Sequence, residues 1–236
     1  MKKILLLLSL FFSPLFFAED GPFTVFYGFQ TENPLDIVAA TDQLWEDCDK
    51  GDVVVSLNAD AINGESSNTH TYVVNFPDNA AFVKWNNLFA TCPGVQKYFE
   101  TVNPIIEFTQ EIMGLPLRGF GDTAQSEYFQ VFSIAVQNPM KFVKAYDELM
   151  ESNTECDSWG LLAFGAGYTR QSGTHLAYCG FNDLTSYLEQ AQVREPTEEF
   201  QKFIRKTFKI SQLNAVSMVE VCLLYTSDAA DDLVCV

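Results

Sequence analysis

Apolar residues follow two different spacings in the first half of the chain. Residues 25–30 form a short apolar run that is typical of a strand, and Asn33 and Pro34 are typical of a helix N-cap and first turn. Apolar side chains then recur at helical spacing on one face of the predicted helix, which therefore covers a sheet. That face consists of Ile37, Val38, Thr41, Leu44, Trp45 and Cys48.

The pattern continues with a hairpin, a second helix and a last strand. Residues 53–61 and 71–76 are apolar and rich in β-branched residues, and the Asn, Gly and Ser residues between them predict a hairpin loop. Asp78 is placed to cap a second helix, which the Pro-Gly step after Cys92 interrupts. A last strand is expected at about residues 105–113. The order strand, helix, strand, strand, helix, strand is that of a ferredoxin-like domain.

The second half of the chain repeats the first at a constant separation of 105 positions, as between Pro34 and Pro139. The dipeptides that recur are Asn33-Pro34 as Asn138-Pro139, Thr69-His70 as Thr174-His175, and Gln96-Lys97 as Gln201-Lys202. Since each sheet has one face without helices, two copies can cover each other sheet against sheet. We predict an α+β protein with two tandem ferredoxin-like βαββαβ domains, residues 19–114 and 126–224, packed as an intrachain α/β barrel. Residues 115–125, with Pro, Gly, Asp and Ser, are expected to be a linker.

One segment carries a family resemblance. Residues 76–89, followed by Pro93 and by residues 95–99, resemble the third strand and second helix of the dimeric α/β-barrel superfamily. More narrowly, the segment is similar to antibiotic-biosynthesis-monooxygenase-like domains, and residues 181–188 form a weaker version. The resemblance implies a ligand cavity between the facing sheets, enclosed here by one chain rather than by two subunits.

The resemblance leaves the activity open. Some relatives are cofactor-independent monooxygenases that act on aromatic or polyketide substrates, some degrade haem, and others have no known activity. Haem degradation there uses an Asn on the first strand, a Trp on the second helix and an axial His beyond it. Trp85 matches the Trp, but the axial position falls near Val95 and residues 25–29 contain no Asn. We therefore expect no haem, and we predict no cofactor.

The two histidines of the chain, His70 and His175, occupy the same position in the two repeats. They could be paired ligands across a pseudo-twofold axis, or each Thr-His pair could hydrogen-bond the end of its hairpin. No carboxylates stand near them at ligand spacing, so no metal site is predicted. The glycines Gly160, Gly165 and Gly167 lie within a predicted strand, which favours a bulge or a close approach over a phosphate loop.

A polar face alternates with an apolar face along residues 53–61. The polar face carries Val54, Ser56, Asn58 and Asp60, and the last strand similarly groups Glu107, Thr109 and Glu111. If these faces point into the barrel, the buried polar groups need a ligand, an ion or a partner to bind. If the faces point to solvent, the polar groups do not indicate a binding site. The 105-position offset places Ala163 and Gly165 opposite Asn58 and Asp60, so such a site would come from one half only. The ligand-binding candidates are Tyr27, Asn58, Asp60, His70, Tyr72, Trp85 and His175; no catalytic residue is identified.

Charge and the N-terminus indicate where the protein acts. The chain has a formal charge of −17, and Lys2, Lys3, an apolar run to Phe17 and then Ala18 have the layout of a secretory signal peptide over residues 1–18. An uncleaved anchor is the alternative, although the run is short for a bilayer span. Cleavage removes two lysines, and such an acidic surface repels phosphate backbones, so we expect no nucleic-acid partner. We predict a secreted or periplasmic monomer, an intrachain pseudo-dimer without membrane insertion after cleavage.

The six cysteines do not follow the repeat. In an oxidising compartment Cys48 and Cys92 are a candidate disulfide, whereas Cys179 lies in an apolar strand and is expected to be a buried thiol. Residues 225–236 resemble translated adaptor sequence, so we interpret them as a non-native tail and leave Cys235 out of the fold.

Two functions remain after these exclusions. The first is binding of a small apolar or aromatic molecule in the barrel, with monooxygenase-type turnover as an extension of it. The second is a non-catalytic structural or interaction module whose barrel is filled by side chains. A roomy cavity lined by Tyr and Asn would contradict the second function.

Overall fold

A computed structural model describes residues 21–152, 155–192, 196–226 and 230–231 of the chain. The predicted signal peptide and most of the predicted non-native tail lie outside these residues. None of the helices in the described ranges combines the length and the apolar character that crossing a bilayer requires.

The two halves contain the same elements in the same order. The first half comprises β1 (Phe23–Gln30), α1 (Pro34–Asp47), β2 (Val54–Ile62), β3 (His70–Phe76), α2 (Asn79–Thr91), α3 (Pro93–Val102) and β4 (Glu107–Phe120). The 3-10 turn η1 (Thr123–Gln125) connects it to the second half. The second half comprises β5 (Tyr128–Val136), α4 (Pro139–Met150), β6 (Ser158–Ala166), β7 (His175–Phe181), α5 (Leu184–Ala191), α6 (Glu198–Thr207) and β8 (Ser211–Tyr225), with β9 (Ala230–Asp231) beyond it. Apart from the split second helix, this is the predicted order.

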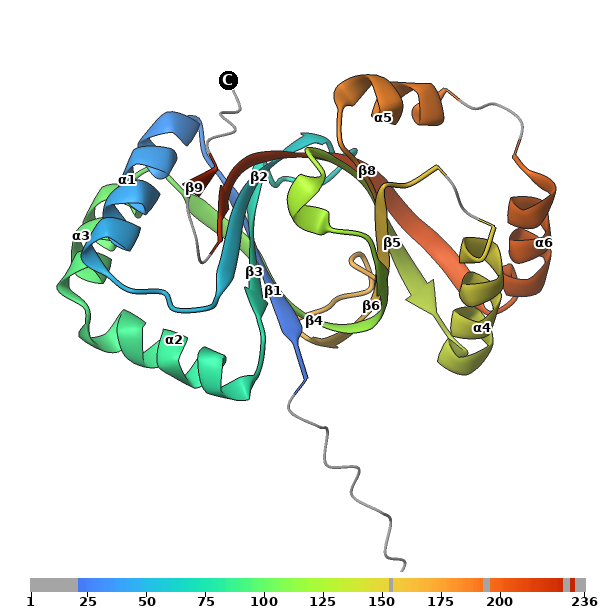
Figure 1. The fold of residues 1–236 in the computed structure, drawn as a ribbon, viewed down its shortest axis with the longest axis horizontal. Coiled ribbons are helices and arrows are strands. Elements are labelled where there is room, and N and C mark those ends of the chain that lie inside the picture. Colours follow the sequence, from blue (N-terminus) through green and yellow to red (C-terminus); the bar gives the residue numbers. More distant parts are fainter. Residues whose placement is uncertain (1–20, 153–154, 193–195, 227–229, 232–236) are drawn as a thin grey trace, which may run out of the picture.

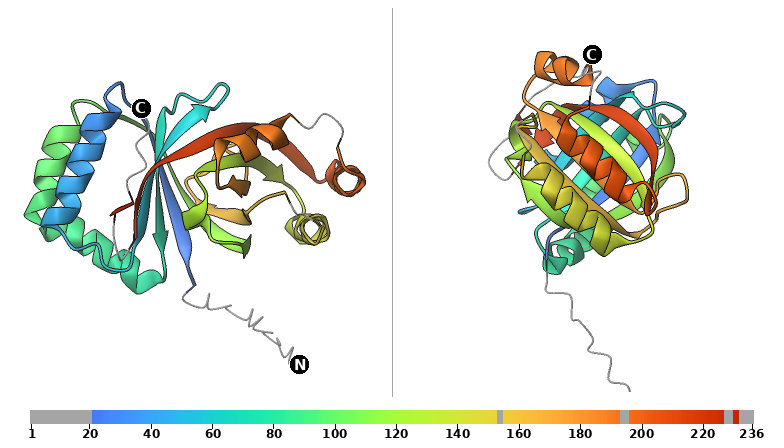
Figure 2. Two further views of the ribbon diagram at one scale, coloured as in Figure 1. Left: turned by 45° about the horizontal axis from the view of Figure 1, so that its top comes forward. Right: turned by 90° about the vertical axis from the view of Figure 1, so that its right-hand side faces the viewer.

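Eight strands of the described residues close into one antiparallel barrel. Their order is β2-β3-β1-β4-β6-β7-β5-β8, and β8 pairs with β2 to complete the circle. The halves meet at two seams, β4 with β6 and β8 with β2. Helices α1–α3 cover one side of the barrel and α4–α6 the other (Figures 1 and 2). The predicted intrachain barrel is therefore present.

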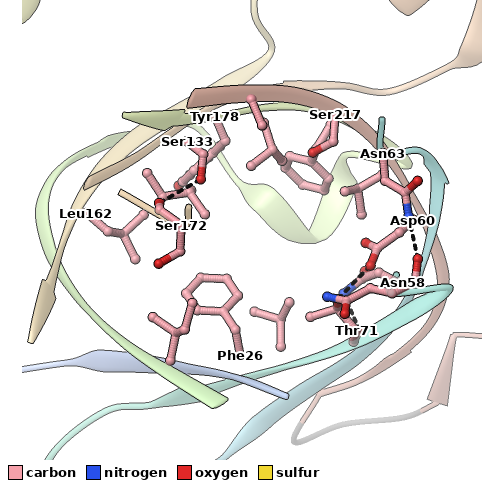
Figure 3. Close-up of a pocket in the computed structure, with 18 of the residues that line it drawn as sticks. Phe26, Asn58, Asp60, Asn63, Thr71, Ser133, Leu162, Ser172, Tyr178 and Ser217 are labelled. Carbon is pink, nitrogen blue, oxygen red and sulfur yellow. Dashed lines mark hydrogen bonds between the residues drawn. The ribbon is translucent and has the colours of Figure 1, made fainter. Parts of the chain in front are cut away.

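Each strand divides its side chains between the helices and the barrel interior. On β1, Phe23, Val25 and Phe29 belong to the core beneath the helices, whereas Thr24 and Phe26 line the interior. Figure 3 shows Phe26 at the cavity. The helix-facing core of the first half contains Ile37, Leu44, Val55, Leu57, Val74, Phe76 and Trp85. That of the second half contains Phe142, Tyr146 and Leu161 in one cluster and Phe181 and Tyr187 in another. Both faces of the sheets are therefore buried, one by helices and one by enclosure.

Strand β4 is longer than predicted. The expected linker begins at Leu115, yet the strand continues to Phe120 and pairs with β6 along this extension. Pro116 is accommodated because the pairing register shifts between Pro116 and Arg118, where the ladder does not need its missing N–H. The linker between paired strands is thus shorter than residues 115–125. Its counterpart β8 likewise runs to Tyr225, which is buried and pairs with Val55, so Tyr225 belongs to the barrel rather than to a separate tail.

The separation between the halves is not constant in the second strand. Strand β2 covers Val54–Ile62 and β6 covers Ser158–Ala166, so here the offset is 104 rather than 105. A one-residue shift moves every side chain of a strand to its other face. The counterparts of Asn58 and Asp60 are therefore Leu162 and Phe164, not Ala163 and Gly165.

The helix caps follow the prediction in part. Asp78 caps α2 by accepting a hydrogen bond from the Ala81 amide at 2.7 Å, and Asn138 caps α4 through the Lys141 amide at 3.2 Å. Asn33 stands at the N-cap of α1 without a side-chain cap bond, which differs from the prediction.

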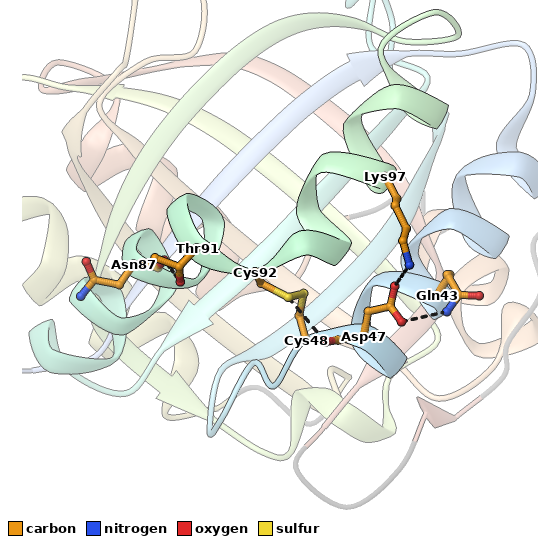
Figure 4. The surroundings of a disulfide bond; sticks show 7 residues. All are labelled: Gln43, Asp47, Cys48, Asn87, Thr91, Cys92 and Lys97. Atoms are coloured by element: carbon orange, nitrogen blue, oxygen red, sulfur yellow. Dashed lines mark hydrogen bonds and ion pairs between the residues drawn. A yellow bond between two sulfur atoms is a disulfide. The ribbon is translucent and has the colours of Figure 1, made fainter.

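Two disulfides stabilise the helix side of the described fold. Cys48 and Cys92, the pair suggested by the sequence, join the end of α1 to the start of α3 (Figure 4). The helices approach closely there, because a Cβ on Gly94 would lie 2.6 Å from the Cβ of Asp47. The expectation of a free thiol at Cys179 is wrong, since Cys179 is bonded to Cys156 in the loop before β6. The position of Cys179 in an apolar strand gave no indication that it is bonded to Cys156.

Candidate functional site

A large cavity occupies the interior of the barrel between its two four-stranded halves (Figure 3). Its volume is about 1220 Å³, somewhat above the range of about 300–1,000 Å³ that is typical of small-molecule pockets. The barrel is therefore not filled by side chains, and the structural-module alternative loses its basis. Asn58 and Tyr178 are both among the lining residues.

The first half supplies a polar wall. Asn58 is 3% exposed, and its amide Nδ2 donates to the Ser56 hydroxyl at 3.1 Å and to the Thr71 carbonyl oxygen at 3.2 Å. The Thr71 hydroxyl donates to Asp60 Oδ2 at 2.9 Å. Thr24 and Asn75 form a further pair at 2.7 Å. These bonds orient the side chains toward the cavity and leave acceptor oxygens available on Asn58 and Asp60.

Asp60 is the carboxylate within this wall. Burial raises the pKa of Asp60 to about 6, and the hydrogen bond from Thr71 partly offsets that rise. Among the described residues, no Lys, Arg or His forms an ion pair with it. Asp60 is thus charged at neutral pH without a cation beside it, and a hydrogen-bond donor on a ligand would stabilise it.

The wall from the second half is apolar around Leu162, although Ser133, Tyr178 and Ser217 also contribute hydroxyls to it. Phe129, Val131, Leu162, Phe164 and Leu176 line it. The shifted offset places Leu162 and Phe164 where the first half has Asn58 and Asp60. Tyr178 lies against Gly160, where a Cβ would be 2.5 Å from its ring. Apolar contact on one side and hydrogen-bonding groups on the other favour an amphipathic, flat ligand.

Two loops border one end of the cavity. The β2–β3 loop is held by a hydrogen bond from the Thr109 hydroxyl to Asn68 Oδ1. The β6–β7 loop is held by the Ser133 hydroxyl, which donates to the Ser172 carbonyl at 2.8 Å, and by the Asn214 amide, which donates to the Arg170 carbonyl at 2.7 Å. The backbone at this end is therefore tied to the strands. Glu107 and Glu111 are exposed, whereas Thr109 and Gln110 line the cavity.

Five of the seven candidate ligand-binding residues do not line the cavity. Only Asn58 and Asp60 do so. Tyr27, Tyr72 and Trp85 belong to the first half's helix-side cluster or pack against it. His70 alternates with the cavity-lining Thr71 on β3, and His175 contacts Phe142 of α4 at 6.1 Å between ring centroids. These five residues cannot contact a molecule in the cavity unless the sheet opens.

The histidines form equivalent structural pairs. His70 Nδ1 lies 2.9 Å from the Thr69 hydroxyl, and His175 Nδ1 lies 2.9 Å from the Thr174 hydroxyl. Each hydroxyl in turn accepts from the backbone at the end of the neighbouring strand, at Thr31 or Val136. Burial lowers the pKa of both histidines, so both are neutral at pH 7. This geometry fits the hairpin-end interpretation rather than paired ligands.

No cofactor ligand set points into the cavity from the described part of the chain. Groups of three or more His, Cys, Asp and Glu side chains that could hold a metal are not found there. Both histidines face the helices, so neither can be the axial ligand of a haem in the cavity. Besides hydroxyls and amides, the lining includes the carboxylates of Asp60 and Glu65 and the guanidinium groups of Arg118 and Arg170, which suit hydrogen bonding to an organic ligand.

Sequence reasoning missed several lining residues. Thr71, Ser133 and Tyr178 contribute polar atoms to the cavity and were not candidates. Thr71 had a usable signal, because it pairs with Asn58 across the hairpin and so shares its face. No such signal pointed to Tyr178. The constant separation of 105 residues shifted the predicted register of β6, the strand that pairs with β7, by one residue.

Comparisons with known proteins support the fold. No protein-family model and no curated protein matches the sequence. Among solved structures, a candidate monooxygenase from Lactobacillus acidophilus superposes with a TM-score of 0.60 at 13% identity, covering 91% of this chain and 100% of that one. An anthrone oxidase-like protein gives a TM-score of 0.56 at 10% identity, covering 89% and 95%. A candidate monooxygenase from Fusobacterium nucleatum gives 0.55 at 14% identity, covering 92% and 99%.

Proposed function

We propose that this chain, which has the fold of the dimeric α/β-barrel superfamily, binds a small aromatic molecule with a polar edge inside its barrel. The observation that carries the proposal is the cavity of about 1220 Å³, which has Asn58 and Asp60 on the wall from the first half and Phe129, Leu162 and Phe164 on the wall from the second. A cavity of this size without a ligand leaves Asn58 and Asp60 hydrated beside a large apolar surface. A ligand that meets both walls removes that apolar surface from water.

The two walls set the orientation of the ligand. Its ring lies against Phe129, Leu162 and Phe164, where flat apolar contact is available. Its polar edge lies against Asn58 and Asp60. Two repeats of one ancestral half, in which only the first retained polar residues on its second strand, would account for this asymmetry.

We extend the proposal to oxidation of such a ligand by molecular oxygen without a cofactor. The structural neighbours named as candidate monooxygenases and as anthrone oxidase-like support this extension at the level of fold. A shaped apolar pocket with a few groups that stabilise a developing anion is what such a reaction needs from the protein. We also propose that the protein acts in a secreted or periplasmic setting, which suits the disulfides Cys48–Cys92 and Cys156–Cys179.

Filling the cavity tests the proposal. Ser217 lines the cavity on β8, and Ser217→Trp places an indole in its interior (Figure 3). Ser152, exposed after α4, gives the matched control Ser152→Trp. Titration of 1-naphthol by its fluorescence is expected to show binding to the wild type and to the control, with at least about a tenfold loss in Ser217→Trp.

Oxygen uptake tests the extension separately. Anthrone with the wild-type protein is expected to consume oxygen faster than anthrone alone, and Ser217→Trp is expected to remove the difference. Naphthol binding without any uptake across anthrones and phenols would eliminate the oxidation and leave the binding function. Equal naphthol binding by the wild type and Ser217→Trp would place the ligand outside the barrel and reject the proposed site.

A further inference from the structure

The cavity contains one acidic side chain on its polar wall, and its surroundings define what it can bind. Asp60 lies on β2, with its carboxylate fixed by the Thr71 hydroxyl at 2.9 Å. Asn58 is two residues away on the same face and is almost fully buried at 3% exposure. Since Nδ2 of Asn58 is engaged by Ser56 and Thr71, its Oδ1 is the atom left to meet a ligand. Asp60 and Asn58 together therefore present acceptors, not donors.

Other charged groups near Asp60 do not neutralise it. On the neighbouring strands His70 and Glu220 are directed to the helix side, where His70 stacks on Phe29 and Glu220 accepts from Tyr128. Glu65 in the β2–β3 loop is acidic as well. The cations Arg118 and Arg170 also line the cavity. Arg118 is paired with Asp147 through bonds of 2.7 and 3.0 Å, and Arg170 lies in the β6–β7 loop; neither forms an ion pair with Asp60. Among the described residues, the carboxylate of Asp60 is consequently not neutralised by a paired cation.

We infer that Asp60 selects the ligand, accepting a hydrogen bond from a neutral hydroxyl on an aromatic ring and repelling anions of similar size. This inference rests on the proposed function, because it names the chemical class bound at that same site. A phenol or an enol provides the donor that two acceptors require. A carboxylate or sulfonate brings a second negative charge beside Asp60 and has no donor, so it is disfavoured. Asp60 is thus a specificity-determining residue of the cavity.

A pair of naphthalenes tests this selection. 1-Naphthol carries a neutral hydroxyl at the working pH, and 1-naphthalenesulfonate stays anionic throughout. At about pH 7.5 the wild type is expected to prefer naphthol. Asp60→Asn is expected to reduce that preference at least about tenfold, because an amide can donate to the sulfonate and carries no charge. Asp52→Asn, at an exposed loop position with the same change in charge, is the control and is expected to keep the wild-type preference.

The pH dependence gives a second readout that a structural role would not move. Lowering the pH to about 5 protonates Asp60, whose pKa is about 6, and is expected to tighten sulfonate binding to the wild type but not to Asp60→Asn. Thr71→Val keeps the carboxylate and removes the hydrogen bond that lowers its pKa. In that variant the tightening is expected at higher pH than in the wild type.

The outcomes separate the two proposals. Reduced preference in Asp60→Asn, with the shifted profile in Thr71→Val, supports selection by Asp60. Naphthol binding that Ser217→Trp abolishes but with the same preference in Asp60→Asn overturns the role of Asp60 and leaves the cavity function intact. Failure of both probes to bind the wild type and Asp60→Asn overturns the selection and the proposed function together.

Discussion

Three hydroxyl groups form a buried network between the first sheet and its helices. The Tyr72 hydroxyl lies 2.6 Å from that of Thr41 on α1 and accepts from the Tyr98 hydroxyl of α3 at 3.2 Å. Burial raises the pKa of Tyr72 well above its ordinary value, so the phenol stays neutral. The network therefore joins sheet and helices by neutral hydrogen bonds and has no access to the cavity.

Removing the central hydroxyl should cost stability and leave binding unchanged. Tyr72→Phe removes the hydroxyl that accepts from Tyr98 and contacts Thr41, so we expect a loss of about 1–2 kcal/mol in the free energy of unfolding, measured in urea. Naphthol affinity is expected to stay at the wild-type value. Tyr168→Phe, at a side chain that is 49% exposed, serves as the control. A loss of naphthol affinity in Tyr72→Phe with unchanged stability would contradict this structural role and would indicate that Tyr72 contacts the ligand.

Asp60 should also make stability depend on pH. Its folded pKa of about 6 lies above the ordinary aspartate value of 3.8, so the folded state binds more protons between these values. The free energy of unfolding therefore falls as the pH rises from about 4 to about 6, and stays lower above that range. Asp60→Asn removes this penalty, and we expect it to be more stable than the wild type at pH 7 by on the order of 1–2 kcal/mol. Urea titrations at about pH 4 and pH 7 measure it, and an equal difference at both pH values would contradict the assignment.

At the scale of residues, alternation identified Asn58 and Asp60 because polar groups two apart share one face of a strand. The same rule could not say which face meets the helices when both faces are enclosed. His70 and Tyr72 were chosen for their chemistry, although the less conspicuous Thr71 between them is the one that lines the cavity. Residue type thus misdirected the choice where only the register of the barrel could decide it.

At the scale of elements, the sequence pattern predicted the central helices and hairpins correctly, but it did not predict the full length of the long strands β4 and β8. Gly114, Pro116 and Gly119 are typical of a linker, yet β4 continues through them with two register shifts. The extension is stabilised by pairing with β6 from the other half, which local propensity cannot report. Non-local pairing is therefore the physical reason for the error.

The disulfide between α1 and α3 should contribute to stability without touching the cavity. It closes a segment with a sequence separation of 44 and is accompanied by an exposed ion pair from Lys97 to Asp47 at 2.8 Å (Figure 4). Replacing Cys48 and Cys92 together by Ala is expected to lower the free energy of unfolding by about 2–4 kcal/mol, mostly by releasing the unfolded chain. The ion pair adds little, because both groups are in contact with solvent.

Chemical denaturation of the double variant measures this contribution. Lys97→Ala is the matched comparison and is expected to cost less than about 1 kcal/mol. Naphthol affinity should be equal in all three proteins, because neither cysteine lines the cavity. A double variant as stable as the wild type would show that the helices hold this geometry without the bond.

At the scale of the whole molecule, the repeat predicted the barrel because two sheets with bare faces have one economical way to bury them. The constant separation of 105 residues, however, predicted the wrong cavity-facing residues on β6. The offset changes to 104 in β6, and this change turns Leu162 and Phe164 into the cavity. A one-residue change in separation that preserves every element is not detected by a search for matching residues at constant spacing, yet it places Leu162 and Phe164 on the cavity wall.

The two seams should make the halves unfold together. β4 pairs with both β1 and β6, and β8 with both β5 and β2, so neither half can lose its sheet without exposing the edges of the other. Phe142, 1% exposed in the second half's core, gives a local perturbation: Phe142→Ala is expected to cost about 3–5 kcal/mol. In a Trp159→Phe background the remaining tryptophans, Trp45 and Trp85, report only on the first half. Their unfolding midpoint in urea is expected to fall as far as that of the whole protein followed by circular dichroism. A tryptophan midpoint that Phe142→Ala leaves in place would mean that the first half is stable alone and that the barrel is an assembly of independent domains.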